Sequence, residues 1–369
     1  MGLQSRIDLY KKIEAYRKKP LIVYVTSTRP QALGFMAQDV ITEMLTQLHA
    51  LPKCDELDFF VSSNGGDPFV SSNGGDPTVA WRIVSLLREK VKKFSILIPQ
   101  AAYSAATLIA LGADEIVMHP YGNLGPTDPQ IDNFKKDIKF GSEDVQAFLR
   151  FAREEVGLTD QESLRDLFLK LSEEVGFTSI GVAARSSQLS VSIGEKMLHL
   201  HMKEGEARTR ARSISEALNS KYFHHGYPLS RTEAKEIGLS VADTDQTIED
   251  LMWAVWKDLE ADLKIREAFV PLGLFSSNPA CQALFSPIRQ QQNAQVVPPT
   301  PFDYTACLME SCRCASRYQV AGRLFAGRQA DLEIKIQIAT EKMGWIDVPM
   351  PMPAPGLGAA ANVGAGNAP

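Results

Sequence analysis

Residues 101–131, AAYSAATLIALGADEIVMHPYGNLGPTDPQI, decide the fold class of this chain of 369 residues. Ser104 stands among alanines where an apolar helix is expected to begin, and a short strand and a Gly/Pro turn come after it. An α/β protein presents a nucleophilic serine in this way, because the helix dipole and free N–H groups at a helix N-terminus favour negative charge. Serine is also a preferred helix cap, so Ser104 alone leaves a purely structural role open.

A tandem repeat lies upstream of this stretch: the nine residues FVSSNGGDP occur at 60–68 and again at 69–77. Each copy contains two adjacent glycines, Gly65–Gly66 in the first and Gly74–Gly75 in the second. Without side chains, their N–H groups can point at a ligand oxygen, which is how an oxyanion hole is built.

The two copies of the repeat differ in the residues on their C-terminal side. Only the second copy precedes a helical pattern, and its Asp76 and Pro77 suit the start of a helix. We therefore expect Gly74 and Gly75 to donate to the oxyanion. The first pair, Gly65 and Gly66, would then lie in an added bulge, and the reverse assignment remains open.

Short apolar runs alternate with amphipathic segments around these motifs. Strands are expected at 21–26, 57–61, 94–98 and 115–118, and helices at 39–51, 78–90 and 104–111. This alternation indicates an α/β protein with a mostly parallel sheet and right-handed crossovers. From residue 142 the pattern becomes helical.

Composition divides the chain into four parts. We expect one domain over 1–270, a Pro/Gln-rich linker over 271–300, a small β-rich extension over 301–348 and a disordered tail over 349–369. Within the extension, residues 306–325 and 330–338 are predicted as two strands of a hairpin around Gly327.

Bulk properties exclude several classes of function. The net charge of −5 argues against nucleic acid as the main partner. No apolar run reaches the length of a membrane span and no signal-peptide pattern opens the chain, so a cytoplasmic protein without stable membrane insertion is expected. The five cysteines form no C-x-x-C pair and no G-x-G-x-x-G follows a strand, so neither a metal nor another cofactor is predicted.

The motifs NGGDP, PQAAYSAATLIALGADEIVM and LGPTDPQI, in this order, resemble the Clp-fold serine peptidases. These include the Clp protease proteolytic subunit and signal peptide peptidase A, and the most similar family is the serine dehydrogenase proteinases. The resemblance implies a ClpP/crotonase-like fold of repeated ββα units, with flanking helices, helical insertions and a C-terminal β-hairpin. It also implies a serine endopeptidase that acts on a peptide or protein and assembles as a homo-oligomer.

The resemblance further implies the roles of single residues. Asp128 stands where the Clp subunit has its histidine, and His224 and His225 stand near the position of its late aspartate. In the exchanged order of the serine dehydrogenase proteinases, Ser104 is the nucleophile, His225 the general base and Asp128 its orienting group. His224 remains a second candidate for the base. The N–H of Ala105 would complete the oxyanion hole.

Three alternatives remain from the sequence. Lys139 could serve as base in a Ser104–Lys139 dyad, as in signal peptide peptidase A. The chain could instead be an acyl-CoA enzyme on the related crotonase scaffold, where two N–H groups stabilise an enolate without a serine nucleophile. Thirdly, the duplicated loop could block the oxyanion hole and leave an inactive binding scaffold.

Overall fold

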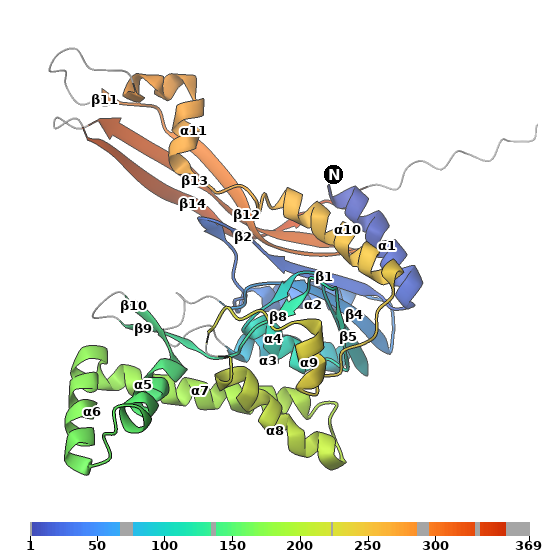
Figure 1. Ribbon diagram of the computed structural model, residues 1–369. Coiled ribbons are helices and arrows are strands. Elements are labelled where there is room, and N and C mark those ends of the chain that lie inside the picture. Colours follow the sequence, from blue (N-terminus) through green and yellow to red (C-terminus); the bar gives the residue numbers. More distant parts are fainter. Residues whose placement is uncertain are drawn as a thin grey trace, which may run out of the picture.

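The computed structural model describes residues 2–66, 77–133, 138–222, 224–285, 295–328 and 333–351 (Figure 1). The helices are α1 (Leu3–Arg17), α2 (Val40–Ala50), α3 (Pro77–Lys90), α4 (Ala105–Leu111), α5 (Ser142–Glu154), α6 (Gln161–Val175), α7 (Phe177–Leu198), α8 (Gly205–Ser220), α9 (Arg231–Glu236), α10 (Gln246–Asp262), α11 (Pro271–Ser277) and the 3₁₀ helix η1 (Pro279–Phe285). The larger strands are β1 (Leu21–Thr26), β4 (Glu56–Ser62), β5 (Lys93–Ile98), β7 (Glu115–Met118), β12 (Thr300–Ser311), β13 (Ala315–Arg328) and β14 (Ile334–Val348). The short strands are β2 (Thr28–Arg29), β3 (Ala32–Leu33), β6 (Ala101–Ala102), β8 (Asn123–Leu124), β9 (Gln130–Asn133), β10 (Ile138–Gly141) and β11 (Gln295–Val296).

The centre of the molecule is one eight-stranded mixed sheet. Its order is β11-β13-β12-β1-β4-β5-β7, and β14 pairs with β13. The four strands β1, β4, β5 and β7 are parallel, as the alternating pattern predicts. The α/β class with a mostly parallel core is therefore confirmed.

Helices cover both faces of the parallel strands (Figure 1). In β1, Leu21 and Val23 pack with α1 and α10 on one face, whereas Ile22 and Tyr24 point into the larger core with α2, α3 and α4. This period of two follows from the pleat of a strand, and a strand covered on both sides reads as a continuous apolar run. Each large side chain buried in this way contributes about 1.5–3 kcal/mol.

The C-terminal strands join the central sheet. β12 pairs antiparallel with β1, where Tyr24 faces Met309, and then continues into β13 and β14. The prediction of one strand over 306–325 was wrong, because a turn after Ser311 divides it. The Ser311 hydroxyl accepts the N–H groups of Arg313 and Cys314 and so closes this turn.

Part of the predicted linker is packed structure. Within 271–300, Phe275 of α11 and Leu284 of η1 are fully buried against the C-terminal strands. The expectation of a free linker was therefore wrong for α11 and η1, since their apolar side chains find a core despite the Pro-rich composition. The predicted tail begins at 349, and residues 352–369 lie outside the described residues.

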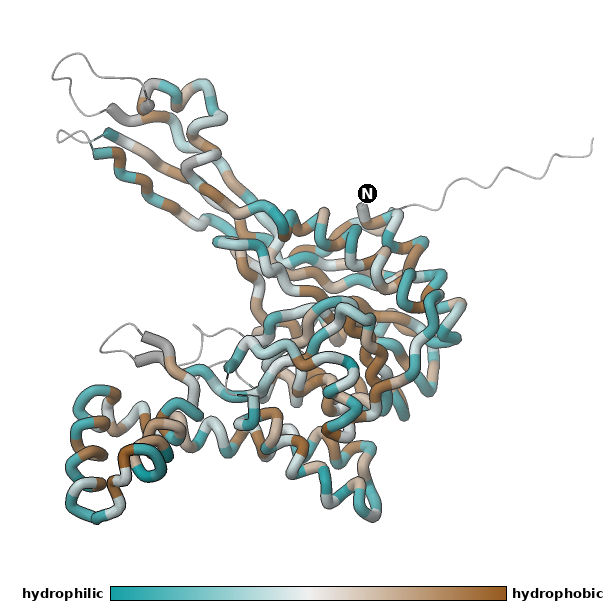
Figure 2. Tube along the Cα trace, in the orientation of Figure 1, coloured by the Kyte–Doolittle hydropathy of each residue, from teal (hydrophilic) through white to brown (hydrophobic). Residues whose placement is uncertain are grey.

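The helices α5, α6 and α7 extend away from the sheet (Figure 1). α6 has no buried residue, and Figure 2 shows apolar residues, in brown, along these helices. Several of their large apolar side chains are exposed to solvent. Phe177 is 81% exposed and Phe151 56%. Throughout the described ranges, no helix is both long enough and apolar enough to cross a membrane.

A buried ionic cluster fixes α1 to the remainder of the fold. The Arg6 guanidinium is fully buried and lies 2.8 Å from both Glu310 of β12 and Asp258 of α10. The Tyr10 hydroxyl donates to Glu310 at 2.8 Å. This ionic cluster therefore links α1, β12 and α10. Removal of any one partner would leave a buried charge without one of its counter-charges and so lower the stability of the fold.

Candidate active site

Ser104 precedes α4 in a strained backbone conformation. Its φ of 53° and ψ of −114° are unusual for a residue with a side chain, and its hydroxyl forms no capping hydrogen bond. A helix-capping role, which the sequence left open, is therefore not what the hydroxyl performs. Such strain at the junction of strand and helix resembles the turn that exposes a nucleophilic serine.

The first glycine pair lies directly against this serine. A Cβ built on Gly65 would stand 2.7 Å from the Ser104 Cβ and 2.7 Å from the Tyr103 carbonyl oxygen. Gly65 also has a φ of +103°, which residues other than glycine adopt rarely. Only glycine satisfies both the backbone conformation and the close approach.

Ser63 connects the glycine loop to the segment that carries Ser104. Its N–H donates to the Ala101 carbonyl at 2.9 Å, and its own carbonyl accepts the Tyr103 N–H at 3.0 Å. Its hydroxyl accepts the Gly65 N–H at 3.0 Å and the Thr26 hydroxyl at 2.8 Å. Ser63 and Gly65 of the first repeat copy are thus hydrogen-bonded beside the candidate nucleophile.

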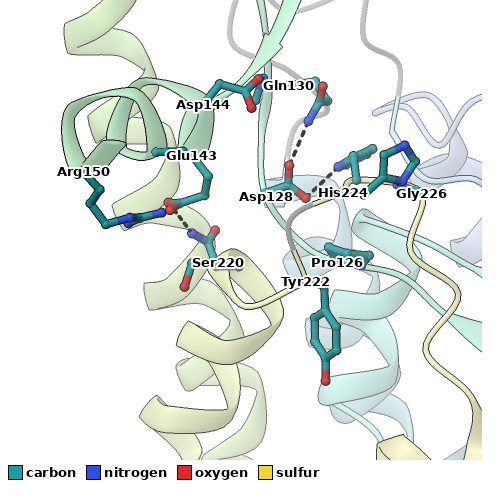
Figure 3. A pocket seen from close by; sticks show the side chains of 14 residues that line it. Pro126, Asp128, Gln130, Glu143, Asp144, Arg150, Ser220, Tyr222, His224 and Gly226 are labelled. Atoms are coloured by element: carbon teal, nitrogen blue, oxygen red, sulfur yellow. Dashed lines mark hydrogen bonds and ion pairs between the residues drawn. The ribbon is translucent and has the colours of Figure 1, made fainter. Parts of the chain in front are cut away.

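Asp128 and His225 form a hydrogen-bonded pair. His225 Nδ1 lies 2.8 Å from Asp128 Oδ1, and Gln130 Nε2 donates to Asp128 Oδ2 at 2.8 Å. The dashed line between Asp128 and Gln130 is visible in Figure 3. When the Nδ1–H of a neutral His225 donates to the Asp128 carboxylate, Nε2 carries no proton and can accept one.

The backbone explains why these residues meet across 97 positions of sequence. Leu124 and Leu229 exchange two N–H to carbonyl hydrogen bonds of 3.0 and 2.9 Å, which places residues 224–229 beside the turn that leads to Asp128. Thr107 of α4 fixes that turn, since its hydroxyl donates to the Ala102 carbonyl and accepts the Gly125 N–H at 3.1 Å.

The structure brings together some of the predicted site residues. In the part of the chain that it describes, no hydrogen bond joins the Ser104 hydroxyl to His225. Gly74 and Gly75 lie outside the described residues. Lys139 is in β10 opposite Asp132 of β9, and its side chain is likewise outside the description.

A cavity of about 260 Å³ lies beside the Asp128–His225 pair. Figure 3 shows that its lining comes from the turn at Pro126, from α5 and from the end of α8 with the loop after it. The side chains of Glu143, Asp144 and Arg150 line it from α5. Among the described residues, no group of three His, Cys, Asp or Glu side chains is arranged to hold a metal ion.

Comparison with known proteins adds to this geometry. Residues 3–139 match the family of ClpP-like SDH-type serine proteinases. The resemblance that the sequence motifs indicate is confirmed over this segment, and the match supports a serine peptidase.

Individual relatives and solved structures have low sequence identity to this chain. Two uncharacterized proteins of Methanocaldococcus jannaschii, MJ1495 and MJ0137, are 24% and 23% identical; the alignments cover 65% and 64% of this chain and 72% and 73% of the relatives. A serine-to-alanine mutant of the 1510-N membrane-bound stomatin-specific protease has a TM-score of 0.37 at 13% identity, with 62% of this chain and 83% of that chain covered. ClpP1 from Listeria monocytogenes has a TM-score of 0.32 at 11% identity, with 66% and 98% covered.

Three residues near the candidate site were not predicted from the sequence: Gln130, Glu143 and Asn219. Gln130, which contacts Asp128, stands two positions further on in LGPTDPQI and could have been found from that spacing. Glu143 and Asn219 contact each other at 3.5 Å from α5 and α8. They belong to helical stretches without a motif, so no local signal marked them.

Proposed function

We propose that this protein is a serine endopeptidase with Ser104 as nucleophile, His225 as general base and Asp128 as the group that orients His225. The Ser104 hydroxyl attacks the carbonyl carbon of a peptide bond, and the proton of that hydroxyl passes to His225 Nε2. The same proton is then given to the leaving amine, and water hydrolyses the acyl-enzyme by the reverse sequence. Asp128 keeps the proton on Nδ1 and stabilises the imidazolium.

The observation that carries this proposal is the hydrogen bond between His225 and Asp128, together with the strained and uncapped Ser104. Hydrogen bonds between a catalytic base and its nucleophile are often long in free enzymes and shorten when substrate binds. His225 lies on a loop after α8, so we expect it to approach Ser104 in the substrate complex.

For the oxyanion hole we propose the N–H groups of Gly66 and Ala105. The Gly65 N–H already bonds to Ser63, and the Gly65 carbonyl accepts the Met36 N–H at 2.9 Å. Ala105 is the first residue of α4, and an N–H at this position has no partner within the helix. Each such donor is worth roughly 3–4 kcal/mol of transition-state stabilisation.

This assignment favours the first repeat copy over the predicted pair Gly74 and Gly75. The contact of Gly65 with Ser104 supports it, because an oxyanion donor has to lie next to the nucleophile. The additional nine residues would then come after the working loop and leave its geometry intact.

We further propose that the protein acts on peptide or protein substrates as a homo-oligomer. The exposed apolar side chains of α5, α6 and α7 support an assembly, since large exposed apolar patches commonly mark interaction surfaces. Phe151, Phe168, Leu169 and Phe177 are between 45% and 81% exposed. Size-exclusion chromatography with light scattering tests this, and a monomer at micromolar concentration would contradict it.

Hydrolysis of a quenched-fluorescent peptide library tests the peptidase and its base. We expect Ser104→Ala to abolish turnover, His225→Gln to reduce it by on the order of 10³-fold or more, and Lys139→Met to leave it near the wild-type rate. Loss of activity in Lys139→Met with retention in His225→Gln would instead establish the Ser104–Lys139 dyad. Turnover that survives Ser104→Ala would refute the proposal.

A further inference from the structure

Glu143 is a carboxylate in the cavity beside the proposed triad, and its present hydrogen bonds are all long. Its Oε1 accepts from Gln146 Nε2 at 3.3 Å, from the Ser187 hydroxyl at 3.4 Å and from Asn219 Nδ2 at 3.5 Å. Burial raises the pKa of Glu143, which is the response of a carboxyl group that lacks a strong cationic partner.

The other carboxylates of the cavity are already occupied. Asp128 accepts from His225 and Gln130, and Asp144 caps α5 by accepting the Gly141 N–H at 2.6 Å. These bonds are all shorter than the three to Glu143, so Glu143 is the cavity carboxylate that its present partners hold most weakly.

Asn219 supplies a second, independent acceptor. Its residue is only 4% exposed, it lines the cavity, and its Nδ2 donates to the Ser187 hydroxyl at 2.8 Å. Its Oδ1 is buried and has no hydrogen-bond partner within the described part of the chain. A buried acceptor without a donor is unfavourable, so a ligand N–H that reaches Oδ1 supplies a hydrogen bond that the free protein lacks.

We propose that this cavity is a specificity subsite for a basic side chain, lysine or arginine, of the peptide substrate. The ligand's N–H groups donate to Glu143 and Asn219 Oδ1, and its positive charge pairs with the Glu143 carboxylate. This inference rests on the proposed peptidase function. A volume of about 260 Å³ suits a single side chain better than a whole small molecule, whose pockets measure about 300–1,000 Å³.

Arg150 is the cationic side chain that competes for the same carboxylate. Figure 3 shows the side chains of Glu143 and Arg150, which lie about two turns apart on α5, extending toward each other. Arg150 is exposed, so it can move into solvent when a substrate cation enters. Removal of Arg150 should therefore strengthen cation binding, while removal of the Glu143 charge weakens it.

Binding to the Ser104→Ala protein tests the subsite without any turnover. N-acetyl-lysine methylamide and N-acetyl-arginine methylamide are titrated by calorimetry, with N-acetyl-leucine and N-acetyl-glutamate methylamides as the neutral and acidic arms. We expect Glu143→Gln to weaken binding of the basic probes by about tenfold or more, since a hydrogen bond to a charged group is lost. Glu154→Gln, the same charge change on α5 outside the cavity, should leave binding unchanged, and Arg150→Ala should tighten it.

Each other outcome overturns the inference. These outcomes are no preference for the basic probes, preferred binding of the acidic probe, equal behaviour of Glu143→Gln and Glu154→Gln, and no tightening in Arg150→Ala. If wild-type protein cleaves peptides in a Ser104-dependent manner without preference for lysine or arginine, the subsite fails and the peptidase stands. If the basic probes bind as expected but no peptide is cleaved, the peptidase proposal fails instead.

Discussion

Replacement of Gly65 by alanine tests which glycine pair works beside Ser104. The new Cβ would lie 2.7 Å from the Ser104 Cβ, so the two segments have to separate by about 0.7 Å to reach an ordinary contact near 3.4 Å. A shift of about 1 Å at a catalytic centre can cost on the order of a hundredfold in rate. We therefore expect kcat/KM to fall by roughly one to two orders of magnitude in Gly65→Ala.

The backbone strain of the substitution needs its own control. Gly65 has a φ of +103°, and an alanine forced into such a conformation costs about 1–3 kcal/mol of folding stability. Gly157 offers a matched case, because its φ is +77° and an added Cβ there meets nothing within 4 Å. Gly157→Ala should lose a similar amount of stability and keep its activity.

The assay combines peptide hydrolysis with chemical denaturation of all variants at one temperature. If Gly65→Ala retains activity within about threefold of Gly157→Ala at equal stability, the contact with Ser104 has no catalytic meaning. In that case the second copy would be the working loop, and Gly74→Ala should be the damaging substitution.

Three further predictions concern other groups. Asp128→Asn should lower kcat by on the order of 10⁴-fold, because the amide favours the wrong tautomer of His225, while thermal unfolding changes little; an unchanged kcat would contradict the triad. Burial raises the pKa of Glu143, so its ionisation costs stability as pH rises through the interval between its unfolded and folded pKa values. Glu143→Gln should therefore be more stable than wild type at pH 7 and lose that advantage near pH 4, and an equal Tm difference at both pH values would refute this. Arg6→Met removes the cation that lies 2.8 Å from the buried Glu310 and leaves only Arg317 at 3.9 Å, so it should cost about 3–5 kcal/mol in urea denaturation, whereas a loss below about 1 kcal/mol would contradict the role of the cluster.

Local sequence predicted the parallel core well. β1 and β7 have the predicted bounds, and β4 and β5 each extend one residue beyond theirs at one or both ends. These strands are continuous apolar runs between amphipathic helices, so both their burial and their period can be read from neighbouring residues.

The C-terminal strands could not be placed from the sequence in this way. β12 pairs with β1 across about 285 positions, where Ile22 faces Ser311. Such a pairing depends on which edge strand of the parallel sheet lacks a neighbouring strand, and no local pattern encodes it. The burial of Phe275 in the predicted linker has the same cause, since its partners come from distant strands.

In the candidate site, too, some residues could be predicted from the sequence and others could not. Ser104 stands in a local motif, and Asp128 and His225 were predicted from a family resemblance. The match over residues 3–139 covers Asp128 and ends before His225. The two glycine pairs have identical sequence surroundings within the repeat, so sequence alone cannot distinguish them. Our proposal for the first pair depends on the close approach of Gly65 to Ser104, which only the three-dimensional structure reveals.

Covalent labelling is the direct test of whether Ser104 is an activated nucleophile. The wild-type protein is treated with a fluorophosphonate, and the adduct is located by intact mass and peptide mapping. We expect one adduct per chain on Ser104, absent in Ser104→Ala and strongly slowed in His225→Gln. An adduct on another residue, or labelling that persists in Ser104→Ala, would contradict the account.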